Sequence, residues 1–247
     1  MMIILGCTKL MRILVWLLLF AVLPVAADTP AASVQTFSLN YSVFRNQALL
    51  GVAELQNKQV SPGSWQFISK TTATQGIANF AGASIHEQSN LIVRNGTLEL
   101  FSNRLETKLA WKNILKTSQL INDRKNYAYK DDKSTKLAPY RAGVLDQHSL
   151  TLALMADINA QNKGPSFVYA VFNKGKIEPY TFKIIGNQSI STALGKLKTV
   201  RVERVRETNN GKNTRIWFAI DKNYVPVLIQ QSDENGDDIE MRITAIK

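Results

Sequence analysis

The chain has 247 residues, a formal net charge of +11 and a single cysteine, Cys7. This length favours one large domain over two small ones. A domain of roughly 220 residues buries enough surface to fold without disulfide or metal cross-links. Because Cys7 lies near the N-terminus, the rest of the chain has no thiol, which excludes disulfide frameworks, cysteine zinc sites and thiolate catalysis there.

The N-terminal segment has the pattern of a secretory signal over residues 1–27. Lys9 and Arg12 precede an apolar run over 13–23, and a proline and small residues follow it. A charged start, a short apolar core and a small-residue exit define a signal peptide, and the run is shorter than the about 20 residues that span a bilayer. We therefore expect cleavage, a periplasmic or secreted location and no membrane span in the mature chain, as opposed to a retained anchor. A start at Met11 would give the same signal.

Export changes how the positive charge is interpreted. Removal of residues 1–27 takes away two basic residues and leaves a net charge of about +9. In the cytoplasm such a charge would favour nucleic acid, whereas outside it the polyanions are lipid headgroups, cell-wall polymers and acidic proteins. We expect a lipid or another anionic envelope component as partner, and no nucleic acid.

The mature chain begins with a predicted disordered leader over 28–34, followed by one β-rich domain over 35–247. From Phe37 to Val43 apolar and polar residues alternate, which is typical of a strand with one buried face. A turn near Arg45 predicts a return strand, and Ser-Pro-Gly-Ser at 61–64 predicts the next turn.

The firmest predicted hairpin turns at Asn95-Gly96, because this dipeptide readily adopts the two positive φ values of a type I′ turn. The strand before it places Glu87 on the same face as Ile85 and Leu91. A carboxylate on a buried face is costly unless it is paired. Glu87 is therefore predicted either to bind an arginine or to line a ligand cavity.

One helix is predicted over 147–159, with apolar residues recurring four apart in a wide stripe. Asp146 is its expected N-cap, with its carboxylate accepting the backbone N–H of Ser149. After Gly164 the pattern is β to the end of the chain, and 167–172 is apolar on both faces, which predicts a central strand. The predicted fold is mainly β, an antiparallel curved sheet, half-barrel or barrel with one central amphipathic helix.

The order of several short motifs resembles the family called domain of unknown function 3108 (DUF3108), whose members are exported bacterial proteins. The resemblance extends from about Phe37 to Met241, and it implies a β architecture like the half-barrels of periplasmic lipoprotein carriers, without implying an activity. His148 and the basic stretch 105–116 depart from the family pattern. The motifs are the Tyr41 strand with its Gly51 return strand, Glu87-Gln88-Ser89 before Asn95-Gly96, Leu145-Asp146 before Ser149, Gly195 with Thr199, and Trp217 through Asp221 to Val225-Pro226-Val227.

Asp146, His148 and Ser149 are the one cluster with the residue types of a nucleophilic triad. At a helix start Asp146 and Ser149 share a face while His148 points elsewhere, so helix capping is the favoured interpretation and a hydrolase the lesser alternative. Two histidines and no cysteine in the mature chain are too few ligands for a typical zinc site. The acidic turn at 233–238 does not have the residue spacing of a calcium-binding loop. We expect no catalytic site, no metal and no cofactor.

Basic residues crowd one predicted strand and its neighbour: Lys196, Lys198, Arg201, Arg204, Arg206 and Arg215. They are either a solvated strand face that discourages strand addition or a patch that meets an anionic partner.

The leading functional hypothesis is a non-enzymatic envelope protein whose curved sheet holds a lipid or another apolar ligand. The alternative is a structural or assembly protein that binds an acidic envelope component through the basic strand. Candidate cavity residues are Glu87, Tyr41, Trp111, Tyr169 and Trp217.

Overall fold

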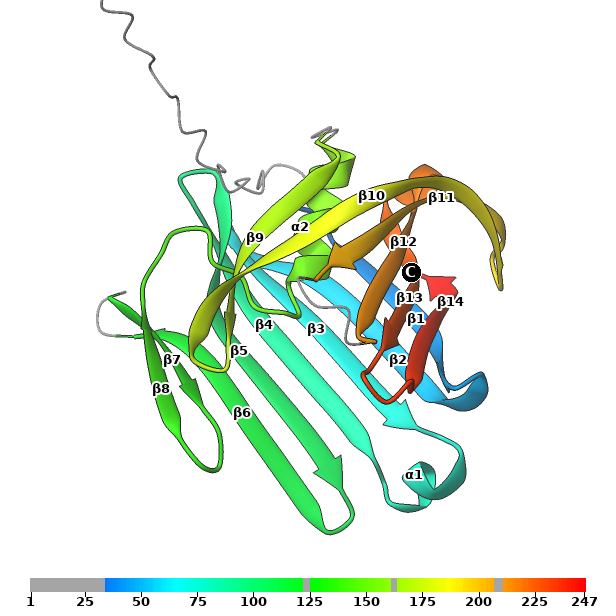
Figure 1. The fold of residues 1–247 in the computed structure, drawn as a ribbon, viewed down its shortest axis with the longest axis horizontal. Coiled ribbons are helices and arrows are strands. Elements are labelled where there is room, and N and C mark those ends of the chain that lie inside the picture. Colours follow the sequence, from blue (N-terminus) through cyan, green and yellow to red (C-terminus); the bar gives the residue numbers. More distant parts are fainter. Residues whose placement is uncertain (1–33, 122–124, 161–163, 207–210) are drawn as a thin grey trace, which may run out of the picture.

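The computed structural model describes residues 34–121, 125–160, 164–206 and 211–247 (Figure 1). The predicted signal peptide, residues 1–27, and the predicted leader up to residue 33 lie outside the described residues. Within those four ranges, no helix is both long enough and apolar enough to cross a membrane.

The described residues form 14 strands, two α-helices and one 3-10 helix. The first part of the chain contains β1 (Phe37–Arg45), β2 (Ala48–Ser61), β3 (Ser64–Ala73), α1 (Gly76–Phe80), β4 (Ser84–Arg94), β5 (Thr97–Leu109), β6 (Lys112–Ile121), β7 (Asn126–Lys130) and β8 (Thr135–Pro139). The second part contains α2 (Leu150–Asn159), β9 (Ser166–Asn173), β10 (Lys176–Thr192), β11 (Gly195–Val205), β12 (Asn213–Ala219), η2 (Ile220–Lys222), β13 (Val225–Ser232) and β14 (Asp238–Ile246).

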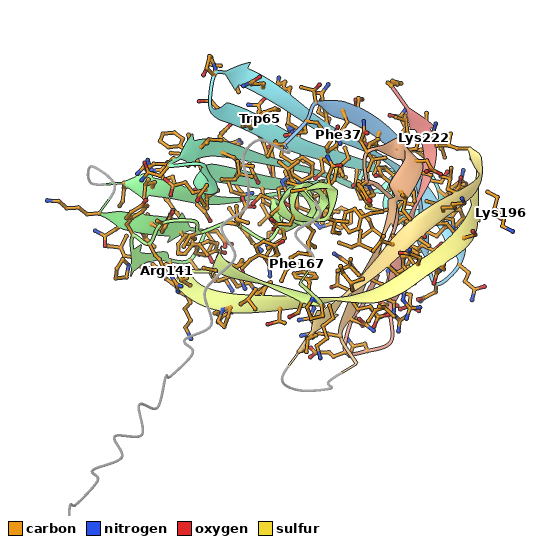
Figure 2. All side chains as sticks on the ribbon, turned by 90° about the horizontal axis from the view of Figure 1, so that it is seen from above. Phe37, Trp65, Arg141, Phe167, Lys196 and Lys222 are labelled. Carbon is orange, nitrogen blue, oxygen red and sulfur yellow. The ribbon has the colours of Figure 1, made fainter. Side chains whose placement is uncertain are left out.

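All of these strands belong to one antiparallel sheet in the order β8-β7-β6-β5-β4-β3-β2-β1-β14-β13-β12-β11-β10-β9. Neighbours in the sheet are neighbours in the sequence, except that β1 pairs with β14 and joins the two ends of the domain. The sheet curls so that its two halves face each other with α2 between them (Figure 2). The predicted fold class, mainly β with an antiparallel curved sheet, is confirmed.

Three hairpin turns have the backbone of a type I′ turn, as predicted for Asn95-Gly96. The φ angles are 48° and 68° at Asn46 and Gln47, 51° and 79° at Asn95 and Gly96, and 49° and 87° at Lys174 and Gly175. Two consecutive positive φ values are the mark of a type I′ turn, whose twist matches that of the flanking strands.

The segment before α2 ties the two halves of the curled sheet together. The Leu100 N–H donates to the Val144 carbonyl at 2.8 Å, the Leu145 N–H donates to Ala170 at 2.9 Å, and the Phe172 N–H donates to Leu145 at 2.8 Å. Because Leu145 forms a parallel bridge with Val171, the free edge of β9 is covered.

β9 is an edge strand, so the prediction of a central strand over 167–172 is wrong. The strand is nevertheless buried on both faces. Tyr169 on one face donates to Asp157 of α2 at 2.6 Å, and Phe172 on the other face packs on Tyr127 of β7 at 5.3 Å between ring centroids. Apolar residues on both faces therefore reflect a covered edge.

Helix α2 is the centre of the hydrophobic core. It begins at Leu150, a few residues after the predicted start, and eight of its ten residues are buried, including Leu152, Leu154 and Met155. The apolar stripe predicted for this helix is therefore part of a surface that is buried almost all round. The predicted hydrogen bond is present, because the Ser149 N–H donates to Asp146 Oδ1 at 2.6 Å. It lies in the turn that leads into the helix, since the N-cap residue of α2 is Ser149 and not Asp146.

Candidate functional site

The concave face of β1–β6 consists of rows of directly opposed residues, which share one face of the sheet. One row joins Thr71, Ile85 and Thr107 near the end of the sheet that carries α1. The next row joins Ser69, Glu87 and Leu105, and the row after that joins Phe67, Ser89 and Asn103 beneath the start of α2. The face thus changes from apolar to polar over about 14 Å of strand, at about 3.4 Å per residue.

An open pocket of about 220 Å³, here called the apolar pocket, lies at the α1 end of the concave face. Gly51, one of its lining residues, leaves no room for a side chain, since a Cβ there would collide with the Thr72 carbonyl oxygen of β3. The concave-face residues that line it are Val43, Gly51, Thr71, Ala73, Ile85, Thr107 and Leu109.

Helix α1 borders the apolar pocket through Ala78 and presents apolar side chains to solvent beside it. Ile77 is 87% exposed and Phe80 is 94% exposed. Exposed apolar side chains gathered beside a pocket are typical of ligand, membrane or protein contact surfaces.

Two further pockets follow the apolar pocket in a chain, each sharing lining residues with the one before it. A pocket of about 340 Å³ shares Leu50 with it, and also contains the Arg45–Asp237 ion pair. That second pocket shares residues 231–233 with a third, of about 270 Å³, which contains Arg204 and Arg206.

A buried polar cluster, formed by Glu87, Ser89, Asn103, Asp146 and His148, lies deeper on the concave face. The Ser89 hydroxyl donates to Asp146 Oδ2 at 2.6 Å and lies 2.9 Å from His148 Nδ1. Because the single hydroxyl hydrogen goes to Asp146, His148 Nδ1 is the donor to Ser89. Asn103 donates to Ser89 at 3.1 Å and to Glu87 Oε1 at 3.0 Å. The cluster fixes the start of α2 to β4 and β5.

The arrangement of these side chains differs from that of a nucleophilic triad. In a triad the histidine lies between the hydroxyl and the carboxylate, whereas here the Ser89 hydroxyl lies between Asp146 and His148. The Ser149 hydroxyl contacts backbone atoms of Asp146. The His148 ring stacks on Phe67 at 4.3 Å between centroids, and its Nε2 is buried without a partner among the described residues.

Glu87 lies between the rest of the buried polar cluster and the apolar pocket, because Ile85, two residues away on the same face of β4, lines that pocket. Burial raises the pKa of its carboxyl group, and the negative charge of Asp146 adds to this, while His148 and the Asn103 hydrogen bond oppose it. An arginine partner, one of the two predicted roles, is absent among the described residues, where Asn103 is the neighbour that donates to it. The ionised Glu87 carboxylate is therefore partly desolvated, which lowers the stability of the fold.

Replacement of Glu87 by glutamine is expected to raise the melting temperature at pH 8, because the variant has no charge to desolvate. A raised pKa in the folded state costs stability only where the unfolded carboxyl is ionised. The advantage of the variant should therefore shrink towards zero as the pH falls below about 4.3, the ordinary value for glutamate. Thermal unfolding followed by circular dichroism from pH 4 to pH 8 measures it.

Glu106→Gln is the matched control for that experiment. The pKa of Glu106 is lowered, first by the hydrogen bond from Asn113, so this carboxylate stabilises the fold when it is ionised. The control should lose stability at pH 8, with the opposite pH trend. Parallel pH trends in the two variants would contradict the role given to burial of Glu87.

The predicted cavity residues do not gather around one cavity. The Tyr41 hydroxyl donates to the Pro226 carbonyl at 2.6 Å inside the core, and Tyr169 donates to Asp157. Trp111 is 73% exposed at the β5–β6 turn. Trp217 lies opposite Arg201 in the sheet, on the face away from Ile216. None of the five lines the apolar pocket. Glu87 lies one row away from it, two residues after the lining residue Ile85, and the large aromatic side chains pack the core or the outer surface.

The six basic residues predicted as one patch occupy three places, because side chains alternate along a strand. Arg204 and Arg206 lie on the face of the buried Val202 and line the 270 Å³ pocket. Arg201 and Arg215 lie on the opposite face and pair with Glu203 at 3.1 and 3.2 Å. Lys196 and Lys198 are exposed at the far end of the β10–β11 hairpin, where Figure 2 labels Lys196.

Ser89 and Asn103 are the site residues that sequence reasoning missed. Ser89 has the same strand parity as Glu87 and Leu91, so a polar residue at a buried position was a visible signal. Asn103 carried no such signal, because a register shift opposite Asn90 and Leu91 changes which residues of β5 face inward. Among the described residues, no group of three or more His, Asp and Glu side chains is placed to hold a metal ion.

Comparison with known sequences gives one family match. The family model described as "Protein of unknown function (DUF3108)" matches residues 59–244. No curated protein matches the sequence significantly.

Comparison with solved structures supports the fold. A β-barrel-like protein of domain of unknown function DUF1849 from Brucella abortus aligns with a TM-score of 0.51 at 9% identity, over 87% of this chain and 98% of that one. The Pseudomonas aeruginosa MucA/MucB complex aligns with a TM-score of 0.32 at 11% identity, over 89% of this chain and 54% of the matched chain. A Bacteroides fragilis protein with a YmcC-like fold aligns with a TM-score of 0.32 at 8% identity, over 90% and 97%. The first match shows a shared fold, and the two lower scores carry no argument.

Proposed function

The chain belongs to the DUF3108 family of proteins of unknown function, and from this premise we propose that it is a non-enzymatic envelope protein that binds an apolar or amphipathic ligand. The ligand would occupy the apolar pocket at the α1 end of the concave face. The observation that carries this proposal is an open pocket lined by small and aliphatic side chains, next to exposed Ile77 and Phe80.

The position of α2 restricts where a ligand is able to bind. Leu152, Leu154 and Met155 fill the interior of the curled sheet, so the space for a ligand is at the end of the sheet that α2 does not reach. Binding an acyl chain there would cover apolar surface, which stabilises a complex by about 25 cal/mol for each Å² removed from water.

The buried polar cluster supports a binding protein over a hydrolase. The Ser89 and Ser149 side chains are fully buried, and each hydroxyl is held by Asp146. A nucleophile must reach its substrate, and its base must be oriented by an acid behind it. Neither condition is met by these side chains, whose hydrogen bonds instead stabilise the start of α2.

The proposed location in the bacterial envelope rests on residues 1–27, whose pattern is that of a secretory signal. An exported protein with an apolar pocket and a basic charge is suited to amphipathic molecules in an aqueous compartment next to a membrane.

The test is titration of the purified protein with a fluorescent fatty-acid probe. Thr71→Phe would place a ring in the apolar pocket, and we expect it to weaken probe binding at least tenfold, which is about 1.4 kcal/mol. Thr107→Phe, on the neighbouring strand, should have a similar effect.

Lys70→Phe is the matched control, because Lys70 precedes Thr71 in β3 and points to the other face of the sheet. It should leave probe affinity within about twofold of the native value. Circular dichroism verifies that each variant is folded. A native protein that binds no probe, or a Thr71→Phe variant that binds like the native protein, would refute the proposal.

The alternative, an assembly protein that binds an acidic partner through β11, has weaker support. It needs a continuous basic surface, whereas the basic residues of β11 are divided between opposite faces and Arg201 is neutralised by Glu203.

A further inference from the structure

The third pocket of the concave side contains two arginines that the apolar-ligand proposal does not use. It lies between the start of α2 and the strands β10–β13, with a volume of about 270 Å³. Arg204 reaches it from β11 and Arg206 from the residue just after β11, together with Tyr180 from β10 and Thr151 from α2. Both arginines point to the interior side of the sheet, because they share the face of Val202.

Arg204 is held in one orientation by an aromatic ring. Its guanidinium carbon lies 3.3 Å from the centroid of the Tyr180 ring. The Tyr180 hydroxyl is itself fixed, because it accepts hydrogen bonds from Gln147 at 2.6 Å and from Asn173 at 3.2 Å. A guanidinium stacked on a ring keeps its N–H groups free in its own plane for an acceptor.

Neither arginine has an acidic partner among the described residues. No ion pair involves Arg204 or Arg206 in that part of the chain, and the Nε atom of each is buried without a hydrogen-bond partner. Burial and the positive charge of Arg204 lower the pKa of Arg206, as expected for two cations that share a pocket. Two half-buried guanidinium groups that share a pocket and form no ion pair repel each other, and an anion bound between them would offset that repulsion.

The other charged residues near the pocket are already engaged. Asp233 lines it, but its Oδ1 accepts the N–H groups of Asn235 at 2.8 Å and Asp237 at 3.0 Å in the β13–β14 turn. Lys212 also lines it and pairs with Glu234 at 3.1 Å. Asp233 is therefore the one carboxylate among the described lining residues, and it forms no ion pair with either arginine.

We propose that Arg204 and Arg206 bind a phosphate group in this pocket. The planar fork of each guanidinium is able to offer paired N–H donors, and phosphate has enough oxygen acceptors to bind both forks at once. The adjacent N-terminal end of α2, a ten-residue helix, adds partial positive charge on the same side. The phosphate is either a free ion or the headgroup of a lipid, and the site does not depend on the apolar pocket.

Isothermal titration at low salt with inorganic phosphate, and separately with dihexanoyl phosphatidic acid, tests the proposal and distinguishes the two sources. Similar affinities for both would identify a site for free phosphate. At least tenfold tighter binding of the lipid would identify a headgroup site whose acyl chains reach the adjoining pockets. Both results support the phosphate site, whereas binding of neither probe, or equal binding of acetate, would overturn it.

The decisive variant is the double substitution Arg204→Gln with Arg206→Gln. It should weaken binding of the tighter probe at least tenfold and abolish the rise in melting temperature that the probe causes. Lys196→Gln with Lys198→Gln removes the same charge from an exposed part of β11 and should change the affinity by about twofold at most.

The melting temperature without phosphate verifies the fold of the double arginine variant, and it should fall only slightly, because the Arg204–Tyr180 stacking is lost but no ion pair is. Single variants at either position replace the double variant if the fall is large. Equal weakening in the arginine and lysine double variants would show a general charge effect and would refute the site. If the fatty-acid probe fails to bind while phosphate binds, the apolar-ligand proposal falls and the phosphate site stands.

Discussion

Replacement of Leu154 by alanine is expected to lower the free energy of unfolding by about 3 kcal/mol, the middle of the range for a fully buried leucine. Leu154 has no exposed surface and lies in α2, which contributes eight buried residues to the core. The loss combines the transfer free energy of the missing carbon atoms with the cavity that they leave. For a domain of about 200 residues this corresponds to a fall of roughly 6–12 °C in melting temperature.

Urea denaturation followed by tryptophan fluorescence measures this loss. Leu137→Ala is the matched control, since Leu137 lies on the edge strand β8 and is 56% exposed. The control should change the stability by no more than about 0.5 kcal/mol. If both variants were equally stable, α2 would not be the centre of the core, and the argument that it fills the interior would fail.

Replacement of Asp146 by alanine should cost about 2–4 kcal/mol, because one side chain holds two different groups. Its Oδ1 accepts the Ser149 N–H in the turn that leads into α2, a contribution of about 1 kcal/mol. Its Oδ2 accepts the buried Ser89 hydroxyl, whose loss of a partner costs about 1–3 kcal/mol more. Equilibrium unfolding in urea gives the sum.

Two further variants separate these contributions. Asp146→Asn keeps one oxygen acceptor for the Ser149 N–H and offers an amide group to Ser89, so it should recover at least half of the loss. Ser89→Ala removes the hydroxyl together with its need for a partner, so Asp146→Ala should cost less in a Ser89→Ala background than in the native protein. A strictly additive double variant would show that Ser89 and Asp146 do not interact.

Local features of the fold were predictable because they depend on residues close in the sequence. The alternation from Phe37 to Val43 predicted the buried face of β1. Asn95-Gly96 predicted the turn between β4 and β5, and Asp146 predicted the hydrogen bond to the Ser149 N–H just before α2. Each depends on backbone preferences or on a hydrogen bond that spans only a few residues.

Features that depend on distant pairing were not predictable. Nothing local to 167–172 shows that the strand lies at an edge, because its cover comes from Leu145 and from Tyr127 of β7. Periodicity reports burial, and a covered edge is buried as completely as a central strand.

The candidate site shows the same division. The parity of β4 placed Glu87 on the inner face, but the Asn103 contact depends on the register between β4 and β5. The basic residues of β11 were visible in the sequence. Which of them lie on each face of the sheet became clear only from the observed pairing of Arg201 with Trp217 and of Val202 with Ile216. Tyr41, Tyr169 and Trp217 were predicted near a ligand because aromatic residues serve both cores and binding sites, and composition does not separate the two uses.

The pairing of β1 with β14 sets a condition on the order of folding. Val43 of β1 pairs with Met241, so one edge of β1 has no partner strand until nearly the whole domain is present. Until then β1 and β2 form a sheet with an open edge, which is able to recruit strands from other chains. Such distant pairing slows folding, and a chain that crosses a membrane from its N-terminus would expose this edge throughout transit. Closure of the sheet by its last strand is thus the step that ends the risk of aggregation.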